Sequence, residues 1–220
     1  MNKTLTRTIC IKLDIDGHEA ALAVTQRAFN AAATWIAQVC WDEGITNTNT
    51  AHHRVYGETR LNFGLGAQLA VCARAKAVEA IKAVKAKQRE TCPTFGPRGS
   101  IRYDARTYRL MSLDRVSLNT LEGRIVCRLV LGTRQHEMLV DPAWAIGGAD
   151  LVWRRGIYFL HVTQSREAPD EHACAIVASL RNRPTPRVTG SAITPSIIRF
   201  LSGSAWNAAF QRVRSSARRD

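Results

Sequence analysis

The stretch FGLGAQLAVCARAKAVEAIKAVKAKQRE, residues 63–90, decides the fold, because its spacing predicts one long helix over about residues 64–90. One side of that helix is apolar and consists of Leu65, Leu69, Cys72, Val78, Ile81 and Val84. A second face is basic, since four side chains recur 8, 3 and 4 positions apart: Arg74, Lys82, Lys85 and Arg89. Pro93 and Gly96-Pro97 are expected to end the helix.

Upstream of this helix the hydrophobic pattern begins with period two and then becomes helical. Residues 3–15 (KTLTRTICIKLDI) alternate apolar and polar side chains, which predicts a strand. Asp16 and Glu19 are three positions apart and predict a capping box at the start of another helix. Gly44 fits the left-handed position that ends it, before a polar loop and a shorter helix over residues 51–61.

Downstream of the basic helix, residues 99–166 predict β structure. Short runs rich in β-forming residues fall around residues 100–103, 107–110, 115–119, 124–131, 150–154 and 157–164. Gly123 and Gly156 lie at the expected hairpin turns, where the backbone needs a positive φ. Residues 134–139 predict a short helix. One early strand, a helical block and several later strands predict an α+β fold with an OB-like β-barrel, an architecture that often binds oligonucleotides.

Composition excludes several classes of protein. No apolar run reaches 18 residues and the N-terminus lacks an apolar signal-peptide core, so neither a membrane span nor secretion is predicted, and a cytoplasmic location is expected. The six cysteines form no CxxC pair, which disfavours a zinc ribbon and suggests reduced, buried thiols. His52-His53 has no further ligand at metal spacing, so no metal and no cofactor are expected.

The positive charge is concentrated in two blocks of a chain whose net charge is +13. Residues 68–109 carry ten Lys or Arg and three Asp or Glu, a net charge of +7. Residues 181–220 carry eight Arg, one Asp and no Lys, which is again +7. The first block coincides with the basic helix and the segment after it, which indicates a polyanionic partner.

Arginine and tyrosine residues are interleaved directly after the basic helix: Arg98, Arg102, Tyr103, Arg106 and Tyr108. Arginines in such an order can neutralise phosphates, and tyrosines can stack on bases. A solvated surface is the alternative interpretation of a basic helix face, and the pattern alone leaves both open.

Seven short segments carry a family likeness: RAFN (27–30), FGL (63–65), AQLA (67–70), SIRYD (100–104), SLNTLEGR (117–124), ADLV (149–152) and FLHVT (159–163). In this order they resemble the TnpB family of insertion-sequence proteins, which are transposon-encoded RNA-guided nucleases related to type V CRISPR effectors. The likeness runs from about residue 3 to about residue 171, and no single segment is diagnostic.

The resemblance implies a wedge-type β-barrel formed by residues 1–16 and 97–166, with a helical recognition insertion over residues 17–96. Together these parts are expected to hold a guide RNA and motif-flanked target DNA. In such systems base pairing reads most of the target, and the protein reads only a short adjacent motif.

By position in the resemblance, Gln68 and its neighbour Leu65 are expected at the helix start that reads the motif. Tyr103 and Asp104 are expected to face the same duplex from the β side. The Gln68 amide can bond an adenine edge through two hydrogen bonds, although a polar surface residue near a helix start is the alternative. Phosphate contacts are expected from seven side chains: Arg74, Lys82, Lys85, Arg89, Arg98, Arg102 and Arg106.

The nuclease half of the family has no counterpart in this chain. The family's nuclease domain is RNase H-like and opens with a strand resembling GVDLGIV, whose aspartate binds magnesium. The matching place here reads EHACAIV (171–177), with Ala173 where the carboxylate belongs. Two-metal hydrolysis needs several converging carboxylates, so no catalytic residue and no cleavage by this chain alone are predicted.

Residues 167–220 are expected to be a degenerate or disordered basic tail in place of that nuclease domain, because they hold four of the seven prolines and no clean periodicity. A frameshifted, truncated gene product and a natural disordered tail are both compatible with this composition. The expected function is binding of guide RNA and target DNA. The alternatives are a nuclease-dead transcriptional regulator and a fragment that is completed by a separate nuclease-containing chain.

Overall fold

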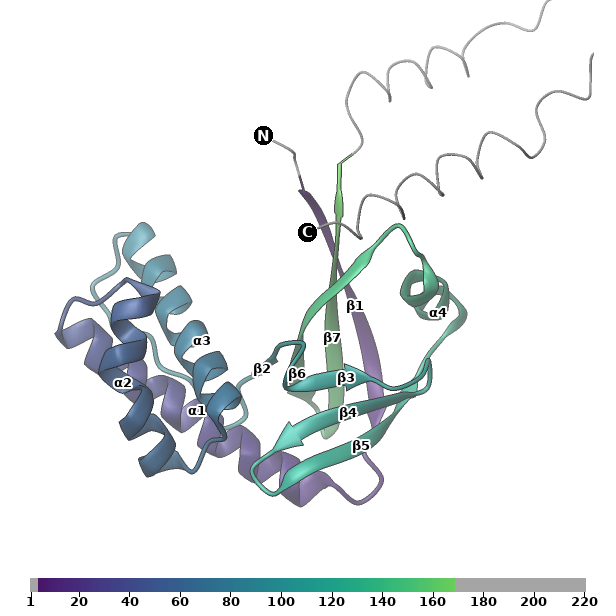
Figure 1. Ribbon diagram of the computed structural model, residues 1–220, viewed down its shortest axis with the longest axis horizontal. Coiled ribbons are helices and arrows are strands. Elements are labelled where there is room, and N and C mark those ends of the chain that lie inside the picture. The colour runs from purple at the N-terminus through teal and green to yellow at the C-terminus, as the bar shows by residue number, and fades with distance from the viewer. Residues whose placement is uncertain (1–3, 169–220) are drawn as a thin grey trace, which may run out of the picture. The chain divides into compact units, whose positions relative to one another are not determined.

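Seven strands join into one antiparallel sheet in the computed structural model, which describes residues 4–168 (Figure 1). In chain order the elements are β1 (Thr4–Asp14), α1 (Glu19–Asp42), α2 (Thr48–Phe63), α3 (Ala67–Ala86), β2 (Ile101–Tyr103), β3 (Tyr108–Leu110), β4 (Arg115–Thr120), β5 (Gly123–Val130), α4 (Thr133–Val140), β6 (Ala145–Arg154) and β7 (Ile157–Glu167). The predicted α+β class is therefore confirmed. The tail expected beyond these elements lies outside the described residues.

The first strand of the chain occupies the middle of the sheet. The strand order is β2-β6-β7-β1-β5-β4-β3, so β1 pairs with β7 on one side and β5 on the other. Its residue Lys12 lies opposite both Phe159 and Val130. Alternate β1 side chains are buried, as the period-two pattern predicts: Ile9, Ile11 and Leu13. The strand expected over residues 3–15 is confirmed.

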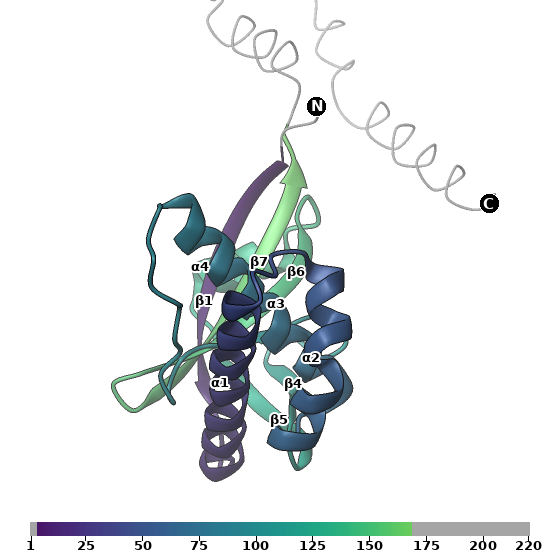
Figure 2. The same ribbon diagram turned by 90° about the vertical axis from the view of Figure 1, so that its left-hand side faces the viewer.

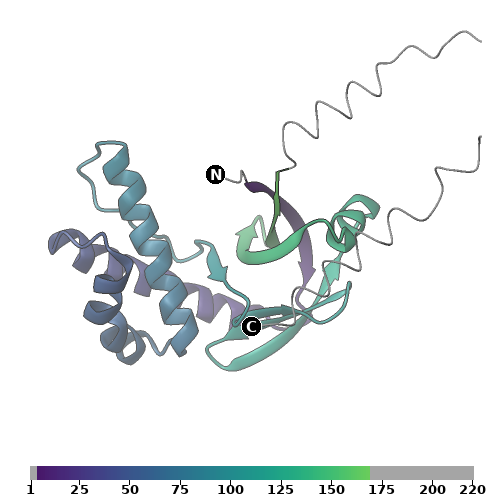
Figure 3. The same ribbon diagram turned by 45° about the horizontal axis from the view of Figure 1, so that its top comes forward.

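Two tyrosine side chains bring the ends of the sheet together into a nearly closed barrel (Figure 3). The hydroxyl of Tyr103 on β2 donates to the carbonyl of Asn119 on β4 at 3.0 Å. The hydroxyl of Tyr108 on β3 donates to the carbonyl of Gly147 on β6 at 2.6 Å. Side chains thus complete the ring where the edge strands are too short to form a ladder.

Helices α1, α2 and α3 follow β1 in the chain and lie side by side on one side of the sheet (Figure 2). Helix α1 ends as predicted at Gly44, which has a φ of 68°. Gly44 donates to the Trp41 carbonyl at 3.2 Å and Ile45 donates to the Cys40 carbonyl at 2.7 Å, the bond pair of a Schellman motif. No helix among residues 4–168 is long and apolar enough to cross a membrane.

The start of α1 differs from the predicted capping box. Asp16 and Gly17 both have positive φ, 40° and 82°, and form the turn that separates β1 from α1. The cap position is His18, and it makes no side-chain cap bond. Asp16 therefore lies two residues before the cap position and does not accept a hydrogen bond from the first turn of α1. Asp16 and Gly17 instead form the reversal between β1 and α1.

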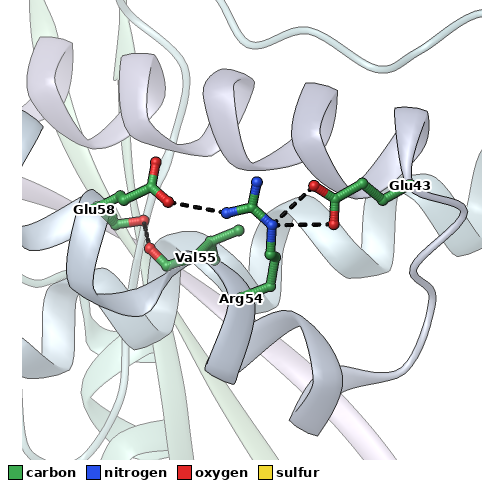
Figure 4. Close-up of polar contacts among 5 residues, drawn as sticks. Glu43, Arg54, Val55 and Glu58 are labelled. Atoms are coloured by element: carbon green, nitrogen blue, oxygen red, sulfur yellow. Dashed lines mark hydrogen bonds and ion pairs between the residues drawn. The ribbon is translucent and has the colours of Figure 1, made fainter.

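Helix α2 begins three residues earlier than expected, because Asn47 caps it. The Asn47 side chain accepts from the N–H groups of Asn49 at 2.8 Å and Thr50 at 3.2 Å. Arg54 then ties this helix to the end of α1, donating to both Glu43 oxygens at 2.8 and 3.1 Å and to Glu58 at 2.9 Å (Figure 4). The Glu43 pair links α2 to the end of α1, whereas the Glu58 pair lies within α2.

Helix α3 is shorter than the stretch that predicted it. It ends at Ala86, because Gln88 adopts a left-handed conformation with φ of 53°. Gln88 donates to the Lys85 carbonyl at 2.9 Å and Arg89 donates to the Val84 carbonyl at 3.1 Å, a second Schellman motif. The expected helix end at Glu90 is wrong, and Arg89 lies beyond the helix.

Candidate nucleic-acid interface

A buried polar contact joins the helices to the strand β2. Gln26 and Asn30 on α1 both donate to the carbonyl of Gly99, each at 2.8 Å. Lys76 on α3 donates to the carbonyl of Ser100 at 2.6 Å and to the Asn30 amide oxygen at 2.8 Å. These bonds hold the chain directly before β2 against α1 and α3. The β2–β3 turn follows this fixed segment after the three residues of β2.

The amine of Lys76 is unusual because it is largely removed from water. It lies 4.6 Å from the ring centre of Phe95 as well as bonding Asn30 and Ser100. Burial disfavours the charged form and lowers the pKa of Lys76 from its ordinary value of 10.5 to about 8. Lys76 is thus a connector between layers rather than a surface charge.

At the start of α3 the structure brings together three of the predicted site residues, which we call the junction cluster: Gln68, Asp104 and Arg106. Gln68 Nε2 donates to Asp104 Oδ2, across 36 positions of sequence. Arg106 donates weakly to Gln68 Oε1, at 3.5 Å. A glutamine from a helix start, and an arginine and an aspartate from the β2–β3 turn, therefore share one surface.

Asp104 has a mainly structural part in this cluster. Its Oδ1 accepts from the N–H groups of Arg106 at 3.1 Å and Thr107 at 3.0 Å, and from the Thr107 hydroxyl at 2.9 Å. With Gln68 on its other oxygen, the carboxylate has four donors. It shapes the turn and orients the Gln68 amide, and its negative charge is shared among these donors.

Tyr103 does not face outward. Its side chain is 1% exposed and its hydroxyl is occupied by Asn119, so the expected contact between this ring and a duplex is corrected to a role in closing the barrel. Burial raises the pKa of Tyr103. Tyr108 is also buried, with its pKa raised to about 12, and is not available for base stacking.

The four basic residues expected on one helix face divide into two groups. Arg74 is half-buried against the start of α2 and donates to the Thr48 carbonyl at 2.6 Å, and burial lowers its pKa. Arg74 therefore contacts α2, and the expected phosphate contact by this residue stays a prediction. The other three are exposed, and we call them the distal cations: Lys82, Lys85 and Arg89.

Arg98 and Arg102 are placed on different surfaces from each other. Arg98 is exposed and its guanidinium lies 4.0 Å from the ring centre of Trp153. Arg102 is paired, at 2.6 Å from Glu79 and 3.9 Å from Asp150. Arg98 keeps an open face for a ligand, whereas Arg102 already has carboxylate partners.

One arginine of this surface was not predicted from the sequence. Arg124 on β5 donates to the carbonyl of Arg106 at 2.6 Å and to the Ser117 hydroxyl at 3.2 Å. It stands beside the junction cluster because β4 and β5 pair in the register Asn119 to Arg124. The hairpin was visible in the sequence, but its contact with the β2–β3 turn depends on the pairing of β3 with β4.

Within residues 4–168, no group of three or more His, Cys, Asp or Glu side chains is placed to hold a metal ion. His52 and His53 contact each other edge to face, at 5.8 Å between ring centres. No protein-family model matches the chain, and no curated protein matches it. The function is therefore inferred from the arrangement of the residues described above.

Proposed function

We propose that this chain binds nucleic acid through the junction cluster and the distal cations, as the non-cleaving N-terminal part of a TnpB-like RNA-guided protein. Its ligands are a guide RNA and the DNA duplex that flanks the target. The supporting observation is that Gln68 and Arg106, 38 positions apart, meet at an exposed corner between α3 and the β2–β3 turn.

The junction cluster has the chemistry to read a base next to a phosphate. A glutamine amide can donate to and accept from one adenine edge, and Asp104 holds the Gln68 amide in one orientation before a ligand arrives. Arg106 is exposed beside it, so its guanidinium can pair with the neighbouring phosphate. On binding, Gln68 Oε1 gives up its weak hydrogen bond from Arg106 and accepts one from the base instead.

The distal cations lie near and just beyond the C-terminal end of α3, and in this proposal they contact the same nucleic acid further along. Gln68 and Lys85 are separated by most of α3, which at 1.5 Å per residue corresponds to about 25 Å. A duplex rises about 3.4 Å per base pair, so about seven base pairs span this length. One duplex, or a duplex that continues into an RNA–DNA hybrid, can therefore contact both groups.

Selection from a duplex library with randomised positions tests this proposal. The wild-type chain is expected to enrich an adenine at one position, and Gln68→Leu is expected to lose that enrichment while retaining most of the affinity. Gln38→Leu is the matched control, since Gln38 is an exposed glutamine of α1 that donates to Asp42. Equal enrichment by all three proteins, or none by the wild type, contradicts base reading by Gln68.

A further inference from the structure

A cavity of about 570 Å³ lies apart from the junction cluster. The end of β1, the first turns of α1, the segment before β2 and the β6–β7 turn enclose it. Binding sites for small molecules commonly measure about 300–1,000 Å³, so this volume is sufficient for one nucleotide. None of the three junction-cluster residues lines it.

Apolar and aromatic groups form part of the wall of this cavity. Leu13 contributes buried aliphatic surface, Val130 and Ile157 contribute exposed aliphatic surface, and Trp153 lies under the guanidinium of Arg98 at 4.0 Å. Because Arg98 is exposed, the face of its guanidinium opposite Trp153 is open to a second planar group. Guanidinium planes stacked in this way are one of the surfaces on which proteins hold unstacked bases.

The inner end of the cavity is rigid before any ligand binds. Gln26 is 1% exposed, and its amide donates to the carbonyls of Arg98 and Gly99 at 3.2 and 2.8 Å. Its oxygen accepts from the Tyr158 hydroxyl at 3.2 Å. These bonds hold Arg98 and Tyr158 in place, so a ligand loses little affinity to the ordering of the wall.

Charges of both signs surround the opening. The cations are Lys12, Arg27 and Arg98, and the carboxylates are Asp14 and Glu19. The cations can pair with an anionic group, and the carboxylates can accept hydrogen bonds from a donor group of the same ligand. A nucleotide suits both, because its phosphate pairs with cations while the amino group of a base can donate to a carboxylate.

We propose that this cavity binds a single nucleotide whose base is out of the stack. The base lies against Arg98 and the apolar wall, and the phosphate contacts Arg27 and Lys12. This goes beyond the proposed interface, because it assigns a second site that takes one unpaired nucleotide. In a bound RNA it would hold a bulged or terminal residue.

Titration with free mononucleotides tests the cavity without a long nucleic acid. Calorimetry with AMP, CMP, GMP and UMP is expected to detect binding of at least one. Inorganic phosphate and the matching nucleoside are each expected to bind about tenfold more weakly, since each lacks one half of the contacts. Equal binding of phosphate alone and of the nucleotide overturns the proposal, because the site would then be only an anion site.

Two matched substitutions on α1 separate the cavity from general surface charge. Ala23 lines the cavity, and Ala23→Phe fills it without changing any charge. Ala31→Phe is the control, on the exposed surface of the same helix and outside the cavity. Circular dichroism establishes that both variants fold. Mononucleotide binding is expected to weaken at least about tenfold in Ala23→Phe and to persist in Ala31→Phe.

Removal of one cation gives an independent check. Arg27 is exposed, so Arg27→Gln is expected to fold normally and to weaken mononucleotide binding about tenfold. If no mononucleotide binds the wild type, or if Ala23→Phe and Ala31→Phe behave alike, the cavity proposal is wrong. The proposed interface is judged separately, by binding of long RNA or duplex DNA.

Discussion

Lys76 is the residue whose environment differs most from that of a surface lysine. Its amine bonds Ser100 and Asn30 and lies near Phe95, which places a charge at the contact between α1, α3 and β2. Since its pKa falls to about 8, the folded protein releases this proton at a pH where the unfolded chain, with a value of 10.5, still holds it. The unfolded state then binds more protons, so folding becomes more favourable as pH rises.

The pH dependence of stability follows from this difference. Between about pH 8 and pH 10.5 the contribution of Lys76 to the free energy of unfolding is expected to rise by about 1–2 kcal/mol, after allowance for solvent screening. Urea unfolding of the wild type and Lys76→Met across this range measures it, because other titrating groups cancel in the difference. A difference that stays constant or falls with pH contradicts the assignment.

Asp104 provides a second prediction about a single residue. In Asp104→Ala the N–H groups of Arg106 and Thr107 lose their acceptor, so the free energy of unfolding is expected to fall by about 1–3 kcal/mol. Gln68 also loses the carboxylate that orients it, so enrichment of a base in the duplex selection should weaken. Chemical denaturation and selection measure the two effects. Asp114→Ala, in another exposed turn, is the control that should leave base enrichment unchanged.

At the scale of elements, the sequence predicted strands better than helix ends. The period-two pattern located β1, and Gly123 and Gly156 located two hairpin turns, both with positive φ in the structure. The errors are at Asp16 and Gln88, which adopt left-handed conformations without being glycine. Local sequence seldom predicts a left-handed residue that is not glycine. The conformation is selected by the packing of the following segment and not by the preference of the residue.

The β6–β7 hairpin tests this interpretation. Arg154 pairs with Ile157, so Arg155 and Gly156 form a two-residue loop in which both have positive φ, 50° and 84°. Such a type I′ turn favours Asn-Gly, and Arg155→Asn is expected to raise the free energy of unfolding by about 0.5–1 kcal/mol. Arg154→Asn, at a paired strand position, should lower it instead. Thermal unfolding measures both, and a loss of stability in Arg155→Asn contradicts the turn assignment.

At the scale of the whole molecule, burial of the site residues depended on barrel closure. Tyr103 shares its strand face with Ile101, which is buried, so alternation contained a signal that the ring points inward. The Gln68–Asp104 contact and the cavity around Arg98 have no such signal. The first joins the start of α3 to the β2–β3 turn, and the second gathers residues of β1, α1 and the β6–β7 hairpin, so each depends on tertiary packing that no local pattern in the sequence encodes.

Binding of RNA and duplex DNA over a series of salt concentrations tests the central claim most directly. The logarithm of the association constant is expected to fall linearly with the logarithm of salt concentration, with a slope near −0.9 for each phosphate contacted on a duplex. Lys85→Gln and Arg106→Gln should each reduce that slope by about one, whereas Arg134→Gln, an equal change of charge on α4, should leave it unchanged. A slope near zero, or no binding at low salt, contradicts the account.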